Sequence, residues 1–271
     1  MTERPTSLRS APPEGAVRQQ PGEAGSAALA WPGADARYVQ RRGEIEHYFD
    51  RTAADTWARL TSTAPVSRVR ATVRAGRDRM RDTLLGWLPA DLRGQRVLDA
   101  GCGTGSFALE LARRGAQVLA IDLSPQLVDV ARERCLAQLQ AEGARGSIDF
   151  RSGDMSSPEL GRFDHVVAMD SLIHYRTADA VRVLGQFADR TAGSMVITFA
   201  PASPLLWAFY GAGKLFPRAD RSPSIVPVSQ AALARQLRLH APMAGWQLAD
   251  SRRIASGFYT SQAYRLQAPR A

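Results

Sequence analysis

Acidic residues end several short apolar runs of this 271-residue chain, and the first of them suggests a ligand with positive charge. Asp99 lies just before a loop that holds Gly101, Gly103 and Gly105. Glycine permits a positive φ angle and lets the backbone approach a ligand closely. The dinucleotide fingerprint G-x-G-x-x-G would need glycine where this chain has Ser106, and the Gly-Lys-Ser/Thr of a P-loop is absent. Because Asp99 would repel a pyrophosphate, the loop favours a cationic ligand.

Two further acids follow the next two apolar runs. Asp122, followed by Leu123, ends the run QVLAID, and its carboxylate could accept both hydroxyls of a ribose. Asp154 could accept an exocyclic amine, and the Met155 thioether could pack on an aromatic ring. An ammonium group, a ribose and an adenine, each bound by one of these three acids, are parts of S-adenosylmethionine (SAM). We therefore place these residues and the glycine loop in a SAM site; the pattern D-x-G-x-G-x-G resembles that of class I methyltransferases.

Asp170 and His174 follow a fourth apolar run, in the sequence VVAMDSLIHY. In an open α/β sheet, ligands bind at the carboxyl ends of the strands near the switch in strand order. We expect Asp170 to flank the cofactor and His174 to face the methyl acceptor. His174 could act as a general base, could orient an already ionised acceptor, or could be structural.

Strand-like and helix-like segments alternate over most of the chain, which predicts an α/β fold with a mostly parallel sheet. Strands are expected at 96–100, 117–122, 148–154, 163–170 and 194–200, with helices between most of them. Two last strand-like runs without a clear helix between them predict a C-terminal antiparallel hairpin. The class I pattern implies a Rossmann-like sheet of seven strands.

The segments before the first strand have a different character. Residues 1–37 are rich in proline, glycine and alanine and are expected to form a disordered tail. Residues 38–90 are expected to form a helical cover, with one helix at 41–60 and a second one from about Pro65. Four arginines at helical spacing on the second helix indicate a solvated face or a surface for an anionic partner: Arg70, Arg74, Arg77 and Arg81. Residues 91–271 would form the cofactor-binding domain, with a substrate insert at 201–227.

Composition limits the function classes without choosing one. The net charge is +9 and the pI is near 10.4, which favours acidic partners. No apolar run is long enough for a transmembrane helix, and the N-terminus lacks the apolar core of a signal peptide. The two cysteines are expected to be reduced thiols. We therefore expect a cytoplasmic protein, and no metal-binding set is predicted within the chain itself.

Five stretches of sequence resemble the magnesium-protoporphyrin O-methyltransferase family in its bacteriochlorophyll-pathway form. They are YFDRTAADTWARLTS, GRFDHVVAMDSLIHY, TFAPASPLL, GKLFPRADRSP and RRIASGFYTSQA. The resemblance extends from about Tyr48 to the C-terminus. It implies methyl transfer from SAM to one propionate of magnesium protoporphyrin IX, which gives a monomethyl ester and S-adenosylhomocysteine (SAH).

The resemblance also implies roles for particular residues. His174 would be catalytic, and Tyr48 would contact the cofactor from a mobile cover. A propionate, like glutamate, has an ordinary pKa of about 4.3, so it is ionised at neutral pH and needs orientation more than deprotonation. Orientation is therefore the favoured role of His174; a base role and contact with the porphyrin magnesium are alternatives. Aromatic and basic residues of the insert would contact the porphyrin: Trp207, Phe209, Tyr210, Phe216, Lys214, Arg218 and Arg221.

Partners follow from the same resemblance. It implies association with the photosynthetic membrane of a bacterium and with a subunit of magnesium chelatase, and the arginine row would suit either contact. Nucleic acid is not expected, because interleaved aromatics and known motifs are missing. Two alternatives remain: another small-molecule O- or C-methyltransferase, acting for example on a quinone, and a basic RNA- or protein-binding module with a vestigial cofactor pocket.

Overall fold

The computed structural model describes residues 36–52, 57, 61, 67–202 and 225–269. Seven strands form one sheet in the order β3-β2-β1-β4-β5-β7-β6. The strands are β1 Arg96–Ala100, β2 Gln117–Asp122, β3 Ser147–Ser152, β4 Phe163–Ala168, β5 Thr191–Phe199, β6 Gln247–Ser256 and β7 Tyr259–Gln267. The first five pair in parallel, whereas β7 pairs antiparallel with both β5 and β6. The predicted seven-stranded sheet with its C-terminal antiparallel hairpin is confirmed.

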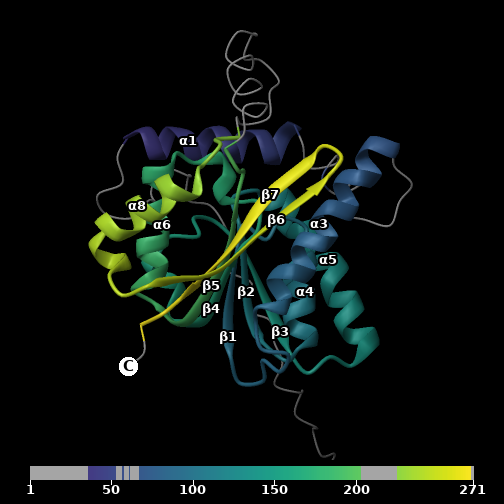
Figure 1. Cartoon of the computed structure of the whole chain (residues 1–271). Helices are drawn as coiled ribbons and strands as arrows, with labels where there is room; N and C mark the ends of the chain where they lie inside the picture. Colours follow the sequence, from purple (N-terminus) through teal and green to yellow (C-terminus); the bar gives the residue numbers. More distant parts are fainter. Residues whose placement is uncertain (1–35, 53–56, 58–60, 62–66, 203–224, 270–271) are drawn as a thin grey trace, which may run out of the picture.

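Helices cover both faces of the sheet (Figure 1). They are α1 Ala36–His47, α3 Arg68–Gly86, α4 Ser106–Arg113, α5 Pro125–Glu142, α6 Thr177–Ala188 and α8 Gln230–Leu239. Alternate residues of each central strand face opposite layers, as the period of two requires. Leu98 and Val166 pack in the core on the side of α6 and α8, while Val97 and Val167 pack in the core on the side of α3, α4 and α5. The central parallel strands are thus buried on both faces, which explains their nearly continuous apolar sequences, whereas the edge strand β3 is mostly exposed.

The N-terminal elements differ in detail from the prediction. The first helix begins at Ala36 and continues as a π-helix, Tyr48–Thr52. The second, α3, begins at Arg68, and the Ser67 hydroxyl accepts a hydrogen bond from the Arg70 N–H, which caps the helix. Ser62, Thr63 and Pro65, where its start was expected, lie outside the described residues, as do most of the predicted tail and the insert residues 203–224.

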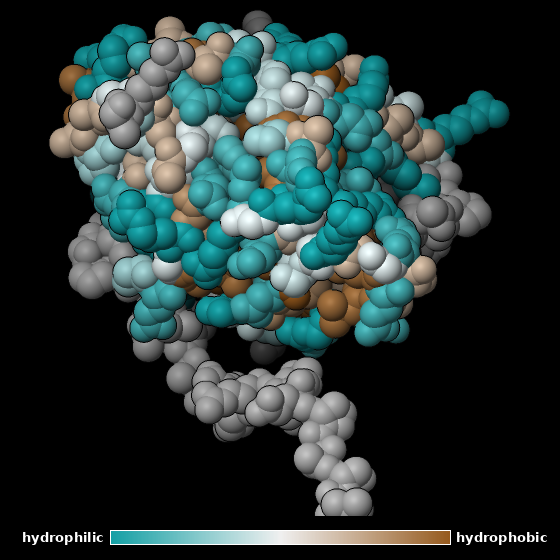
Figure 2. All heavy atoms as spheres, turned by 90° about the horizontal axis from the view of Figure 1, so that it is seen from below, coloured by the Kyte–Doolittle hydropathy of each residue, from teal (hydrophilic) through white to brown (hydrophobic). Residues whose placement is uncertain are grey.

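The two ends of the sheet differ in their surroundings. Loops and α1 lie over the carboxyl ends of the parallel strands, at the top of Figure 1. Figure 2 shows the molecule from below, the end of the sheet away from α1; this surface is mainly hydrophilic, and its hydrophobic residues form small groups. In the part of the chain that the structure describes, no helix is long and apolar enough to cross a membrane.

Candidate active site

A pocket lies at the carboxyl ends of β1, β2 and β4, where the sequence predicts the ligand. It holds about 970 Å³ of empty space, including solvent at its mouth. Its walls come from the glycine loop, the loops after β2, β3 and β4, and the N-terminal helices. Most of the predicted site residues line it: Asp99, Gly101, Gly103, Asp122, Leu123, Asp154, Met155, Asp170 and His174. The switch in strand order between β1 and β4 therefore creates the site, as in other open α/β sheets.

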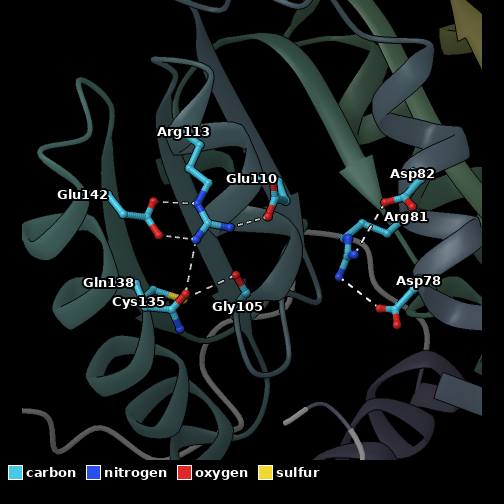
Figure 3. A network of polar contacts seen from close by, with 9 residues as sticks. All are labelled: Asp78, Arg81, Asp82, Gly105, Glu110, Arg113, Cys135, Gln138 and Glu142. Atoms are coloured by element: carbon cyan, nitrogen blue, oxygen red, sulfur yellow. Dashed lines mark hydrogen bonds and ion pairs between the residues drawn. The ribbon is translucent and has the colours of Figure 1, made fainter. Parts of the chain in front are cut away.

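The glycine loop has different reasons for glycine at its first and last positions. Gly101 has φ +82°, and a Cβ there would lie 2.3 Å from Cβ of Ser171, so both the angle and the space exclude a side chain. Gly105, with φ +78°, does not line the pocket; a Cβ there would lie 2.7 Å from the Cys135 sulfur of α5. Figure 3 shows Gly105 beside Cys135, whose thiol donates to its carbonyl at 3.4 Å. Gly105 thus allows α4 and α5 to pack closely, and its predicted contact with the cofactor stays a prediction.

Asp99, which is buried, and Asp122, which is half-buried, form an acidic pair in the pocket. Asp122 accepts hydrogen bonds from the backbone N–H groups of Gly103 at 2.8 Å and Ser124 at 3.0 Å. Among the described residues, Oδ2 of Asp99 is buried and has no hydrogen-bond partner. Burial, and then repulsion from Asp122, raise the pKa of Asp99 to about 7; burial also raises the pKa of Asp122. An unpartnered buried acceptor of this kind fits an ammonium group, so the site suits the cationic cofactor that the sequence predicts.

Asp154 has a role that the sequence did not reveal. Its Oδ1 accepts from the Ser156 N–H at 2.8 Å and from the Ser156 hydroxyl at 2.6 Å, and its Oδ2 forms a 3.1 Å ion pair with Arg42 of α1. The Tyr38 hydroxyl, also on α1, lies 3.5 Å from Oδ1. Asp154 therefore holds α1 against the loop after β3, and its predicted contact with an adenine amine stays a prediction.

Breaking this ion pair is expected to destabilise the protein strongly. The side chains of Arg42 and Asp154 are only 4% and 1% exposed, so Arg42→Ala leaves an uncompensated buried carboxylate, which typically costs about 3–5 kcal/mol. Urea unfolding should show this loss. The matched control is Arg93→Ala at the Arg93–Asp91 pair, whose side chains are 61% and 56% exposed, so that solvent screening leaves the pair little effect on stability. Equal small losses in both variants would contradict the anchoring role.

Asp170 lines the pocket, but its carboxylate is occupied by protein groups. Oδ2 forms a 2.7 Å ion pair with Arg77 of α3, and the hydroxyls of Tyr259 and Ser261 on β7 lie 3.2–3.4 Å from its oxygens. Thr198 of β5 donates to Oδ1 and accepts from the Asp170 N–H. Asp170 has φ +57°, an uncommon angle for a residue with a side chain, and these bonds hold it there. That Asp170 flanks the cofactor stays a prediction; its carboxylate joins α3, β5 and β7.

The predicted arginine row on α3 is not one surface. Arg77 faces the pocket, and its guanidinium lies 4.8 Å from the centre of the Trp57 ring. Arg81 is paired with Asp78 at 3.1 Å and Asp82 at 3.5 Å, as Figure 3 shows. Arg70 is exposed. Arg77 therefore lies in the pocket wall and not on the surface that the row suggests, and an anionic-partner surface formed by the other three arginines stays a prediction.

His174 ends a 3₁₀ turn, Leu172–His174, and lies buried against the cover. Its ring centre is 5.6 Å from that of Phe49, and its carbonyl accepts a 2.9 Å hydrogen bond from Nε of Arg41. The preceding carbonyl, of Ile173, accepts from the Val226 N–H at 2.8 Å. Contacts from both sides of the turn thus fix its backbone and direct the ring to the pocket wall.

The cover contributes a different aromatic residue from the one predicted. Phe49 lines the pocket, whereas Tyr48 does not and lies edge-on to the Phe49 ring at 5.2 Å. Contact between Tyr48 and the cofactor stays a prediction. Sequence reasoning also missed Ile45, Trp57 and Phe107 as pocket residues. Their apolar spacing resembles that of core residues, so no local signal distinguished them.

Comparison with known proteins agrees with this geometry. The family model "Magnesium-protoporphyrin IX methyltransferase C-terminus" matches residues 168–268, and a general "Methyltransferase domain" model matches residues 97–192. The magnesium-protoporphyrin O-methyltransferase of Rhodobacter capsulatus is 51% identical over 83% of this chain and 96% of its own length. This chain belongs to the magnesium-protoporphyrin O-methyltransferase family.

A solved structure of that family agrees with the fold and the cofactor. The magnesium protoporphyrin IX methyltransferase of Synechocystis PCC 6803 with bound SAH superimposes with a TM-score of 0.71 at 27% identity, covering 84% of this chain and 99% of that one. By contrast, the ubiquinone biosynthesis O-methyltransferase of Xanthomonas oryzae is 42% identical over only 34% of this chain and 37% of its own length. The predicted Rossmann-like methyltransferase fold and SAM as cofactor are confirmed, and the quinone alternative loses support.

Proposed function

We propose that this magnesium-protoporphyrin O-methyltransferase transfers the methyl group of SAM to a propionate carboxylate of magnesium protoporphyrin IX. One observation supports the assignment of roles: Asp99, whose buried Oδ2 has no hydrogen-bond partner among the described residues, and His174 line the same pocket, so a cationic methyl donor and its acceptor can meet there. The propionate oxygen forms a bond to the methyl carbon while the carbon–sulfur bond breaks. The bonding electrons stay on sulfur, which gives the methyl ester and SAH.

The residues of the pocket divide this work. Asp99 would pair with the ammonium of the cofactor, and Asp122 and the Gly101–Gly103 turn would bind near its ribose. His174 would donate a hydrogen bond to one propionate oxygen and leave the other free to attack. Because an ordinary propionate is ionised at neutral pH, no proton has to move in this step. We propose that residues 38–90 act as the cover and that residues 91–271 hold the cofactor and, with 201–227, the porphyrin.

Incubation of the purified protein with SAM and magnesium protoporphyrin IX tests the function. A pigment heavier by one methyl group, formed together with SAH, is the expected product. A quinone-pathway phenol offered in parallel should stay unmethylated. If magnesium protoporphyrin is unchanged while RNA binds saturably, the assignment as an enzyme fails.

A patch beside the site suits contact with an anionic membrane surface. Phe258, between β6 and β7, is 78% exposed, and Val69 of α3 is 49% exposed. The hairpin tip packs on α3, since a Cβ at Gly257 would lie 2.4 Å from Oγ1 of Thr72, one helical turn after Val69. Arg68 and Arg70 are exposed on the same end of α3. Exposed apolar side chains among arginines are typical of interfacial membrane binding. A magnesium chelatase partner stays a prediction from the family resemblance.

Vesicle sedimentation tests this patch. Phe258→Ser combined with Arg68→Glu and Arg70→Glu is expected to reduce binding to anionic phosphatidylglycerol vesicles by about tenfold or more, since each basic residue near such a surface contributes about 1 kcal/mol. Arg162→Glu, an exposed position before β4 at the other end of the sheet, is the control and should have a smaller effect. Equal binding by the triple variant and the native protein would rule out this contact.

A further inference from the structure

Arg77 presents unused hydrogen-bond donors to the active-site pocket. One guanidinium nitrogen pairs with Asp170 at 2.7 Å, and the plane lies against the Trp57 ring. Within the described part of the chain, no other partner of this guanidinium occurs. Its side chain is 20% exposed, and the residue lines the pocket. Because a guanidinium has five N–H donors arranged as a fork, the free ones suit a planar anion.

Ser171 provides a second unused polar group in the same wall. Its hydroxyl is buried and, among the described residues, has no hydrogen-bond partner. The residue lines the pocket directly after Asp170 and packs against the position where Gly101 lacks a side chain. Buried hydroxyls are normally hydrogen-bonded, so an unpartnered one facing a pocket indicates a ligand group.

The two groups are connected to the acidic part of the site by direct contacts. Ser171 packs on Gly101, two residues after Asp99, and Asp170 links Ser171 to Arg77. The wall therefore combines an acceptor for a cation, Asp99, with donors for an anion, Ser171 and Arg77. An ammonium and a carboxylate attached to one carbon atom, as in an α-amino acid, match this combination.

We propose that Arg77 and Ser171 bind a carboxylate in the pocket. Two carboxylates enter it during the reaction: the α-carboxylate of the cofactor, next to the ammonium that Asp99 suits, and the propionate of the porphyrin. The contact between Arg77 and Asp170 holds the guanidinium in place for this purpose and prevents it from turning out to solvent. The proposal rests on the proposed function only for the second of these sources.

Ligand pairs that differ only in the carboxylate test the first source. Calorimetry should show that the native protein binds SAH about 10- to 100-fold more tightly than the decarboxylated analogue 5′-S-(3-aminopropyl)-5′-thioadenosine, as expected for charge-assisted hydrogen bonds. Arg77→Met should reduce this ratio towards one, Ser171→Ala should reduce it partly, and Arg77→Lys should preserve part of it. A substitution that only disturbs the structure of the pocket would weaken the binding of both ligands by the same factor and leave the ratio of their affinities unchanged. Arg81→Met, one turn further along α3 at an arginine paired with Asp78 and Asp82, is the control and should also leave it unchanged.

Steady-state kinetics test the second source. The substitutions can leave the ratio of the affinities for SAH and its decarboxylated analogue unchanged. If Ser171→Ala and Arg77→Lys then raise KM for magnesium protoporphyrin IX about tenfold at saturating SAM, the bound carboxylate is the propionate. An unchanged ratio together with an unchanged KM overturns the proposal. The first arm needs no methyl transfer, so it distinguishes failure of the carboxylate site from failure of the proposed function.

Discussion

Replacement of His174 by phenylalanine is expected to lower kcat by about 100-fold or more, while Kd for SAH changes little. Phenylalanine fills the space beside the Phe49 ring but offers no hydrogen bond to the acceptor. Loss of an orienting contact of this kind can reduce the rate by about two orders of magnitude, because the reacting atoms must be held in line. Single-turnover measurement of ester formation, with SAH binding by calorimetry, checks both parts. An unchanged kcat would make His174 structural.

His174→Gln separates orientation from base catalysis. The glutamine amide can donate a hydrogen bond but cannot accept a proton at neutral pH. If His174 orients the propionate, His174→Gln should retain much more activity than His174→Phe, and the rate should depend on pH as in the native protein. If His174 is a base, both variants should be equally slow and a limb of the pH–rate profile should disappear.

Asp99→Asn is expected to stabilise the protein while weakening cofactor binding. The folded protein holds the Asp99 proton to a pKa of about 7, whereas an unfolded chain releases it near the ordinary value of 3.8. Between these pH values the folded state binds more protons, so the free energy of unfolding falls as pH rises through this window and the loss is complete above it. At 1.36 kcal/mol per pKa unit, the loss amounts to about 4 kcal/mol, which Asp99→Asn should remove. Urea unfolding at pH 5 and pH 8 should show the gain mainly at pH 8.

The same substitution should weaken SAM binding by about 10- to 100-fold, because the ammonium loses a charged partner. In the native protein, affinity should fall as pH drops below about 7, since Asp99 must release its proton to pair with the cofactor. Asp99→Asn should lack this dependence. Asp129→Asn, on the exposed face of α5, is the control and should change neither stability nor affinity. A less stable Asp99→Asn protein that binds SAM normally would contradict the assigned role of Asp99.

Most of the fold could be predicted from the sequence because buried parallel strands leave a clear apolar pattern. β1 and β2 have the predicted bounds, and the order of β1 beside β4 follows from the fold family. The N-terminal helices were predicted less well. The π-helix at Tyr48–Thr52 contacts a distant segment, because Asp50 accepts hydrogen bonds from the Ser124 hydroxyl and the Gln126 N–H. The start of α3 at Arg68 has a local cause, the Ser67 cap, which the sequence analysis did not single out.

For the candidate site, the sequence located the acids but not their partners. Asp99 of the D-x-G-x-G-x-G pattern and Asp122 at the end of the next apolar run both line the pocket. The Arg42–Asp154 and Arg77–Asp170 ion pairs join residues 112 and 93 positions apart, and a single sequence contains no signal for such pairings. An arginine at helical spacing has the same appearance whether it faces solvent or a pocket. Only the tertiary structure distinguishes Arg77 from Arg70.

The position of β7 sets the order in which the site can be completed during synthesis. β7 lies inside the sheet, between β5 and β6, although it follows both of them in the chain. Its Tyr259 and Ser261 hydrogen-bond the Asp170 carboxylate, which in turn pairs with Arg77. A nascent chain can therefore form the glycine loop and the Asp99–Asp122 pair early, but the wall that carries Arg77, Asp170 and Ser171 waits for residues 259–261 to leave the ribosome. The cation-binding half of the pocket therefore forms before the other half, and the growing chain carries an incomplete site until β7 inserts into the sheet.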